Sequence, residues 1–284
     1  MNAIDLLLGT IALRPYVFAF LSVFLAAGTL DLGWSRTLRF GISVSPIVWL
    51  AEFSSTRTGI PFGLYHYTGA TRGQELFVAN VPLMDPLSFS FLAYASFCLA
   101  RVVLRGRPVP SALVAPLAGV LMMLLDVVID PAAVRGERWF LGRIFYYPEG
   151  GTYFGVPVSN FVGWVVVGAV GVGIYMFWGA CREAGSIPRR PAGENQRFTM
   201  IGLTDQPGRS AAAADRAFDL YGRRPWPGIA LYYAVLAFNL GVTAWIEEWL
   251  LLTVGVVLHA AAALGLWMIA HRPAVRLGLE KQRA

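Results

Sequence analysis

The stretch VPSALVAPLAGVLMMLLDVVIDP, Val109–Pro131, decides how this chain folds. It stays apolar over about the 20 residues that a helix needs to cross a bilayer, yet it ends in Asp126 and, one helical turn later, Asp130. A carboxylate at the centre of a membrane helix costs at least about 2.5–3.5 kcal/mol. The stretch therefore predicts a transmembrane helix with two acids on one face, and such acids by default indicate a functional site.

The composition extends this prediction to the whole chain. Of its 284 residues, 56% are hydrophobic and only 14% are charged, whereas soluble domains have about 25% charged residues. Apolar runs of spanning length lie at Tyr16–Gly33, Leu38–Ser54, Leu83–Leu104, Val109–Ile129, Val156–Trp178, Ile229–Ile246 and Trp249–Ala270. We therefore predict an all-α fold, a single polytopic transmembrane helix bundle over residues 1–284. It should have about seven helices, or roughly six to eight, since the turn at Glu247–Glu248 has no Gly or Pro.

The placement of arginine predicts the orientation. Lys281 is the only lysine, and the arginines gather after the first, third, fifth and seventh apolar runs, with Arg14 as the exception. Because cytoplasmic loops carry the basic excess, we expect a multi-pass protein of the cell (inner or plasma) membrane, with its N-terminus outside and its C-terminus cytoplasmic. The net charge of +6 then indicates a lipid bilayer with anionic headgroups, and no nucleic acid, as partner. The first residues lack a basic n-region, so no cleavable signal is expected.

The connections on the two sides differ in composition. The segment from about residue 181 to 227 is rich in Gly, Pro, Ala and Arg, which predicts a flexible cytoplasmic loop. A short amphipathic helix at Ala211–Tyr221 is the alternative to a solvated linker there. On the other side, TGIPFGLYHYTG (Thr58–Gly69) and FYYPEGGTYFGVPVSNFVGW (Phe145–Trp164) are aromatic and contain several Gly and Pro. We expect these two aromatic loops to pack into the bundle or to lie at the interface.

The same loops suggest an internal repeat. Two series of residues have about the same spacing from the acid to the proline, namely Glu52, Tyr65, Tyr67 and Val81–Pro82, and Asp126, Tyr146, Tyr147 and Val156–Pro157. The second and third helices and the fourth and fifth helices are therefore predicted to be parallel repeats that line one cavity. Chance similarity between two loops rich in Gly, Pro and aromatic residues is the alternative.

Asp126 and Asp130 are the first candidates for a site. They lie at i and i+4, so their carboxyl groups share a helix face and cannot both ionise cheaply. At least one is expected to stay protonated near neutral pH, which makes it a candidate proton donor. For Asp130 the alternative is a helix end in interfacial water, paired with Arg135 or Arg138.

Two further acids are expected at similar depth. Glu52 lies near the end of the second helix, where an ion pair with Arg57 is the alternative to a functional role. Asp85 starts the third helix, and capping of that helix beside Pro86 is its alternative.

Three other polar positions complete the set. Asn160 lies at i, i+4 from Trp164 and is expected either to orient a water molecule or a carboxyl group, or to form a plain interhelical hydrogen bond. Glu247 and Glu248 are predicted to lie in a solvated turn.

Aromatic side chains are expected to surround these acids. The candidates for substrate binding are Tyr65, His66, Tyr67, Tyr147, Tyr153, Phe154 and Trp164. Membrane-interface belts explain some aromatic residues, but an aromatic cavity also suits a long apolar substrate, and aromatic faces stabilise cations. Acids beside an aromatic wall can protonate an alkene and hold the resulting carbocation.

Several classes of membrane protein are disfavoured. Di-iron hydroxylases need histidine clusters, whereas His66, His259 and His271 are scattered, and a retinal protein needs a lysine within a helix. GAVGVG at 168–173 predicts small-residue helix packing, not a phosphate site. Asp126 and Asp130 form a DxxxD, the kind of pair that binds Mg²⁺-diphosphate in membrane prenyltransferases, but the second Asp-rich motif that those enzymes need is missing from the sequence. No metal site is therefore predicted.

Three stretches in this order resemble the membrane-integral carotenoid biosynthesis proteins, the family that includes carotenoid 1,2-hydratases and bisanhydrobacterioruberin hydratase. They are TGIPFGLYHYT, LLDVVIDPAAVRGERWF and GGTYFGVPVSNFVGWVVVG, and they span roughly residues 45–170. The resemblance implies a hydratase, a hydro-lyase that adds water to the terminal C=C of an acyclic carotenoid end group and gives a tertiary alcohol. It implies no cofactor. The expected partners are the acyclic carotenoid, water, the lipid bilayer and other enzymes of the carotenoid pathway.

The roles that this chemistry implies follow from the residues above. Asp126 is the first choice for the acid and Asp130 for its partner, while Glu52 or Asp85 activates the water that Asn160 helps to position. His66, Tyr65 or Arg135 is expected to stabilise the carboxylate once its proton has left. The alternatives are another carotenoid- or isoprenoid-modifying membrane enzyme, either a lycopene cyclase-like protein or a prenyltransferase or elongase, and a non-catalytic lipid-binding protein.

Overall fold

The computed structural model describes residues 2–105, 107, 109–186 and 222–271. The predicted segment Ala211–Tyr221 and most of the predicted loop at 181–227 lie outside the described residues. The helices are α1 (Ala3–Leu13), α2 (Pro15–Leu32), α3 (Trp34–Thr58), α4 (Met84–Leu104), α5 (Val114–Ala133), α6 (Val158–Ser186), α8 (Trp226–Trp245) and α9 (Trp249–His271). Every predicted apolar run coincides with one of these helices, which confirms the all-α prediction.

The strands in the described part of the chain are four short pieces in the connections, β1 (His66–Tyr67), β2 (Phe77–Val78), β3 (Val81–Pro82) and β4 (Phe145–Tyr146). Among the described residues, six helical segments are long and apolar enough to cross a membrane: Pro15–Leu32, Met84–Leu104, Ser111–Ala133, Val158–Gly179, Trp226–Trp245 and Trp249–His271. Helix α3 is not among them, because its charged residues and its several Ser and Thr residues lower its mean hydropathy. Six spans lie within the predicted range of helices, and they describe a polytopic membrane protein.

One helix end and one whole helix differ from the prediction. Helix α6 continues to Ser186, into the segment predicted as a loop, because Arg182, Glu183 and Ala184 are good helix formers even though they are not apolar. Helix α1 was not predicted. It begins with a capping box, in which the side chains of Asn2 and Asp5 each accept a backbone hydrogen bond from the other residue.

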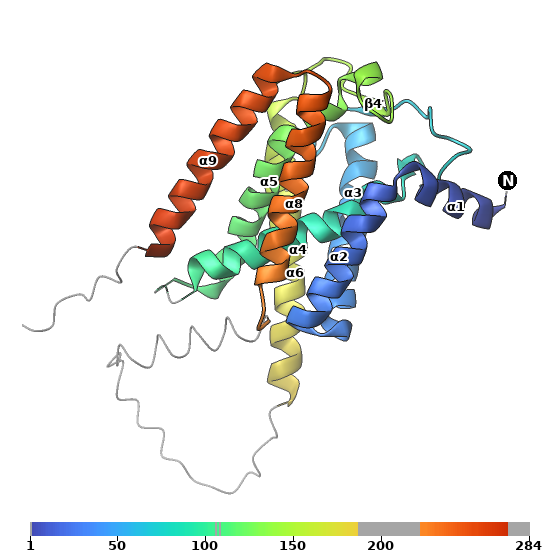
Figure 1. Cartoon of the computed structure of the whole chain (residues 1–284). Coiled ribbons are helices and arrows are strands. Elements are labelled where there is room, and N and C mark those ends of the chain that lie inside the picture. Colours follow the sequence, from blue (N-terminus) through green and yellow to red (C-terminus); the bar gives the residue numbers. More distant parts are fainter. Residues whose placement is uncertain (1, 106, 108, 187–221, 272–284) are drawn as a thin grey trace, which may run out of the picture.

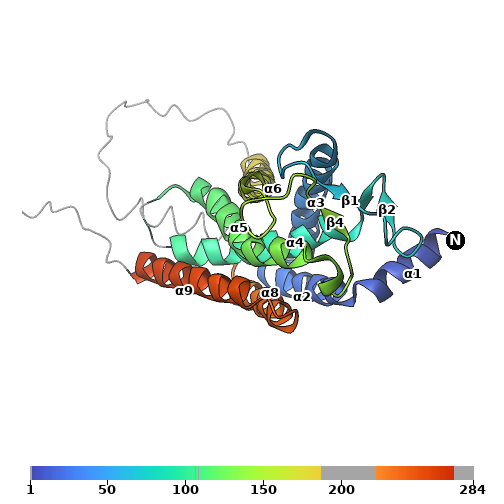
Figure 2. The same ribbon diagram turned by 90° about the horizontal axis from the view of Figure 1, so that it is seen from above.

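Helix α4 is the centre of the bundle, in contact with α2, α3, α5, α6, α8 and α9 (Figures 1 and 2). Helix α9 lies on the outside next to α8, and few of its residues are buried. Helices α5 and α6 approach closely through glycines. A Cβ added to Gly168 would lie 3.1 Å from the Cα of Gly119 and 2.7 Å from the Sδ of Met122. The GAVGVG run is therefore a helix-packing surface, as predicted.

The chain alternates in direction, so one end of the bundle collects the start of α2, α4 and α6 and the end of α3 and α5 (Figure 1). The two aromatic loops connect α3 to α4 and α5 to α6 at this end. They pair with each other as antiparallel strands, β1 with β4, in the register His66↔Tyr146 and Tyr67↔Phe145. Both predicted aromatic loops thus pack over the same end of the bundle.

The first turns of α4 and α6 pack against each other. Asp85 follows Val81–Pro82 at the same interval at which Asn160 follows Val156–Pro157. One turn further along, the rings of Phe89 and Trp164 stack with their centroids 4.1 Å apart. These four residues line one pocket, and the internal repeat itself stays a prediction.

Candidate active site

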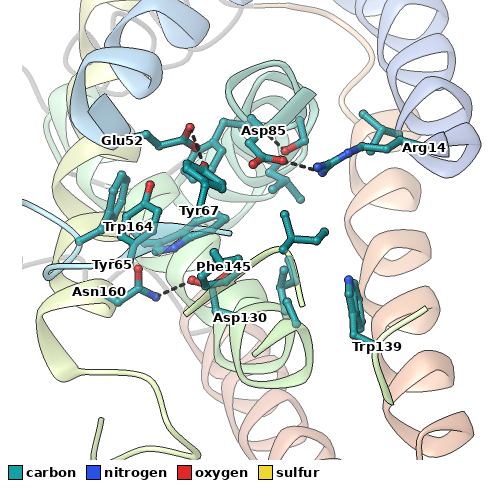
Figure 3. A pocket seen from close by; sticks show the side chains of 18 of the residues that line it. Arg14, Glu52, Tyr65, Tyr67, Asp85, Asp130, Trp139, Phe145, Asn160 and Trp164 are labelled. Carbon is teal, nitrogen blue, oxygen red and sulfur yellow. Dashed lines mark hydrogen bonds and ion pairs between the residues drawn. The ribbon is translucent and has the colours of Figure 1, made fainter. Parts of the chain in front are cut away.

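A pocket lies where the two aromatic loops cover the ends of the helices (Figure 3). The space between its walls measures about 820 Å³, and part of that space is open to the surroundings. The residues of its lining that carry polar groups include Arg14, Tyr16, Glu52, Tyr65, Tyr67, Asp85, Ser88, Asp130, Tyr147 and Asn160. The structure therefore brings four of the five predicted catalytic residues together, and Asp126 is the one that does not line the pocket.

Asn160 joins the two aspartates of α5. Its side-chain nitrogen donates to Oδ2 of Asp126 at 2.6 Å and to Oδ2 of Asp130 at 2.9 Å. Asp126 is 0% exposed, whereas the carboxyl group of Asp130 lies at the pocket surface. Asp126 Oδ1 is also buried and has no hydrogen-bond partner among the described residues. The two carboxyl groups thus form one unit, with Asp130 towards the pocket and Asp126 behind it.

The alternative for Asp130, a pair with Arg135 or Arg138, is not what the structure shows. Nε of Arg135 lies 3.1 Å from Oε1 of Glu248, and Arg138 donates to the same oxygen. The prediction of a solvated turn is therefore wrong for Glu248, because the turn between α8 and α9 folds over the arginines that follow α5. This contact is long-range, and the local sequence contains no sign of it.

Glu52 is 4% exposed and accepts a hydrogen bond of 3.3 Å from the hydroxyl group of Tyr67. Its alternative partner, Arg57, instead donates to the carbonyl oxygen of Phe53 and to Asn80. Burial and the neighbouring Glu52 raise the pKa of Tyr67 and of Tyr65 well above the ordinary value for tyrosine. Both hydroxyl groups therefore stay protonated and can donate hydrogen bonds into the pocket.

Asp85 has a cationic partner. It lies in the first turn of α4, where no side-chain cap is formed, and its Oδ1 accepts from Nη1 of Arg14 at 2.7 Å. Arg14 also binds Glu75, with Nε 2.8 Å from Oε2. The side chains of Arg14 and Glu75 are almost wholly buried, whereas that of Asp85 is 24% exposed. Asp85 is thus the pocket-facing member of a buried ionic cluster.

The aromatic wall contains four of the seven predicted binding residues, Tyr65, Tyr67, Tyr147 and Trp164. The other three lie elsewhere. His66 is exposed and packs against Tyr146, while Tyr153 contacts Phe154 and Phe161 outside the lining. Alternation along β1 explains the first case, because successive side chains of a strand point to opposite sides. Of the three groups expected to stabilise the carboxylate, only Tyr65 lines the pocket, since His66 faces away and Arg135 pairs with Glu248.

Sequence reasoning missed two charged residues of the site, Arg14 and Glu75. Glu75 lies in a polar connection that carries no signal. Arg14 does carry one, since it lies directly before an apolar run and away from the connections in which arginine gathers. A basic residue at such a place needs a local reason, and here that reason is the pair of carboxylates that it binds, Glu75 and Asp85. Among the described residues, no group of three or more His, Cys, Asp and Glu could hold a metal ion.

Fold and site together define a polytopic membrane protein with one pocket that combines carboxyl groups and aromatic rings. The profile of the carotenoid biosynthesis protein family matches residues 1–193, and the chain belongs to this family. The chain is 30% identical over 182 residues to a bisanhydrobacterioruberin hydratase from Haloarcula japonica. That alignment covers 62% of this chain and 58% of the relative, so the chain spans less than two thirds of the relative's length. No solved structure matches the chain.

Proposed function

We propose that this protein is a carotenoid hydratase, which adds water to the terminal C=C of an acyclic carotenoid end group. The observation that carries the proposal is the pocket itself, where three acids and Asn160 face an aromatic wall inside a membrane bundle. Membership of the family and the similarity to a protein named as a hydratase support the same class of reaction. An aromatic pocket that is partly open to the surroundings suits one end of a long polyene, whose remainder would extend out of the pocket.

Asp130 is the proton donor in this proposal, since its carboxyl group lines the pocket. Asp126, the first choice from the sequence, takes a supporting role. Two carboxyl groups that share one amide donor cannot both ionise cheaply, so the pair retains a proton. Transfer of that proton from Asp130 to the less substituted carbon of the terminal C=C breaks the π bond and leaves a tertiary carbocation on the more substituted carbon.

The aromatic wall then stabilises the cation, and water completes the reaction. The rings of Tyr147, Phe89 and Trp164 line the pocket, and aromatic rings attract cations. A water oxygen bonds to the cationic carbon and loses one proton to a pocket carboxylate, either Glu52 or Asp85. Overall, the alkene and one water molecule combine to give a tertiary alcohol, without any change of oxidation state for the whole reaction. Asp130 regains a proton before the next turnover.

Expression in a host that accumulates lycopene, followed by mass spectrometry of the pigments, tests the function. A hydratase adds the mass of one water molecule for each end group that reacts. A product of unchanged mass would instead indicate a cyclase, and addition of a prenyl unit would indicate an elongase. Unchanged pigments with every acyclic carotenoid tested would contradict all three enzymatic functions.

Replacement of the proposed acid tests its role. We expect Asp130→Asn to lower the yield of hydrated product by at least about 100-fold, the usual contribution of a general acid. The matched control is Glu149→Gln, which neutralises an exposed acid of the second aromatic loop and should retain full activity. Protein levels in the membrane would be compared by immunoblot. A fully active Asp130→Asn variant would show that another group donates the proton.

A further inference from the structure

Arg14 is a permanent cation within the wall of the pocket. Its side chain is 4% exposed, and it binds both oxygens of Glu75, with Nε–Oε2 and Nη2–Oε1 distances of 2.8 and 2.9 Å. Its remaining nitrogen, Nη1, lies 2.7 Å from Oδ1 of Asp85 (Figure 3). The guanidinium group therefore binds Glu75 through Nε and Nη2, and it binds the pocket-facing carboxylate of Asp85 through Nη1.

The surrounding backbone fixes this arrangement. Arg14 is the single residue between α1 and α2. The hydroxyl group of Thr10, one turn earlier, accepts a hydrogen bond of 2.9 Å from the backbone nitrogen of Leu76. Helix α1 is thus bound to the residue that follows Glu75. Burial alone would lower the pKa of Arg14, but Asp85 and Glu75 raise it above the ordinary value, so this cation does not lose its proton.

The other acids of the site have neutral donors. Glu52 receives its hydrogen bond from Tyr67, and Asp126 and Asp130 receive theirs from Asn160. A buried carboxyl group without a cation favours its protonated form, whereas one that is bound to a guanidinium group favours its ionised form. The pocket therefore has an ionised side at Asp85 and a protonated side at Asp130.

The ionic cluster also suits the cationic intermediate. One positive charge on Arg14 and two negative charges on Glu75 and Asp85 leave a net charge of one minus beside the pocket. Fixed charge aimed at the place where opposite charge develops lowers a reaction barrier. The same carboxylate that attracts the carbocation can also accept the proton of the attacking water.

We propose that Arg14, held by Glu75, is a positioning residue that keeps Asp85 ionised and so assigns to Asp85, not Glu52, the role of base towards water. The proposal rests on the proposed function. It narrows the choice between the two carboxylates that the reaction scheme left open, and it leaves Glu52 as a second neutral acid. The charged or titratable groups that face Asp85 are Arg14, Tyr16, Glu52, Tyr65, Tyr67, Glu75 and Asp130.

Infrared spectroscopy of the purified protein tests the charge states without any substrate, because protonated carboxyl groups and carboxylates absorb in separate regions. At neutral pH, Asp85→Asn should leave the protonated-carboxyl band unchanged, and Asp130→Asn should reduce it. Arg14→Gln should add intensity to this band, because Asp85 then becomes protonated. The double variant with Arg14→Gln and Asp85→Asn should lack this added intensity. Loss of band intensity in the single Asp85→Asn variant would overturn the proposal, and this single comparison decides even where Arg14→Gln does not fold.

The pH profile of hydration provides the second test. Arg14→Gln should lower the rate at neutral pH at least about tenfold and move the acid limb of the profile to higher pH, because Asp85 then ionises less readily. Arg14→Lys should restore part of the rate at neutral pH and move the acid limb part of the way back. The control is Arg101→Gln, which breaks the other buried pair, Arg101–Asp31 at 2.7 Å, and should reduce stability without moving the limb.

An Arg14→Gln profile that coincides with that of Arg101→Gln would show that Arg14 is merely structural, and would overturn the proposal. The two hypotheses fail differently. A wild-type protein that hydrates no carotenoid but shows the expected infrared pattern would contradict the proposed function and leave the charge assignment standing.

Discussion

Asn160 uses both hydrogens of one amide group on two carboxyl groups of the neighbouring helix. A buried polar group without a partner costs about 1–3 kcal/mol, so this single side chain decides whether Asp126 and Asp130 can lie together inside the bundle. An aspartate at this position would add a third acid, and an apolar side chain would leave two carboxyl groups to repel each other. The amide is therefore both a structural and a chemical part of the site.

Substitution of Asn160 by Leu tests this at the residue scale. We expect the thermal midpoint of the detergent-solubilised protein to fall, in line with a loss of about 1–3 kcal/mol, and hydration to fall by at least about 100-fold. Asn239 is the matched control, because its buried amide donates only to the carbonyl oxygen of Val235 in its own helix. Asn239→Leu should therefore retain hydration, and equal activity of the two variants would contradict the role given to Asn160.

The contact between α5 and α6 positions Asp126 and Asp130 next to the amide group of Asn160. The packing of these two helices therefore controls the geometry of the site. Two glycines face each other across this contact, and a Cβ on Gly119 would overlap the carbonyl oxygen of Val165. Small residues at membrane helix interfaces allow such close approach of backbones. A wider contact would draw Asn160 away from Asp126 and Asp130.

Gly119→Ala is expected to separate the two helices and to destabilise the bundle by about 1–3 kcal/mol, with a parallel loss of hydration. Gly173→Ala provides the control, because a Cβ there would meet only the Cβ of Ala115 at an ordinary 3.9 Å. Differential scanning fluorimetry of both variants measures the effect. Equal thermal midpoints for the two variants would show that the contact between α5 and α6 can accommodate an added methyl group at Gly119.

At the scale of the whole molecule, the pocket and the arginine-rich connections lie at opposite ends. The two aromatic loops cover the start of α4, whereas Arg101 and Arg105 lie at its other end and Arg36 and Arg39 lie at the start of α3. With the orientation that arginine placement predicts, the pocket opens towards the outer half of the membrane. An apolar substrate would then reach it from that leaflet.

Cysteine labelling tests this orientation. In a background with Cys98 and Cys181 replaced by Ala, Thr152→Cys marks the second aromatic loop and Ser35→Cys marks the opposite end, both at exposed positions. A membrane-impermeant thiol reagent added to intact cells should label the first variant and not the second. The reverse pattern would place the pocket at the cytoplasmic face and invert the predicted topology.

The sequence by itself determined the membrane class and the helices, and it marked most of the polar residues that line the pocket. Apolar runs specify helices in a bilayer, because each helix satisfies its own backbone hydrogen bonds and needs no information from elsewhere in the chain. An acid within such a run needs an explanation wherever the helix packs. For that reason the positions of Glu52, Asp130 and Asn160 within or beside apolar runs are enough to mark them as candidates.

Only the tertiary structure decided which side chains form ion pairs and hydrogen bonds with each other. Arg14 and Asp85 are far apart in the chain, as are Asn160 and Asp126, and their contacts arise from helix packing and loop pairing that no local pattern encodes. The same packing places Asp126 behind the pocket and points His66 away from it. Local hydrophobicity fixes the elements, whereas the ionisation of a buried acid depends on its nearest neighbours in space, and those are set by the assembled bundle.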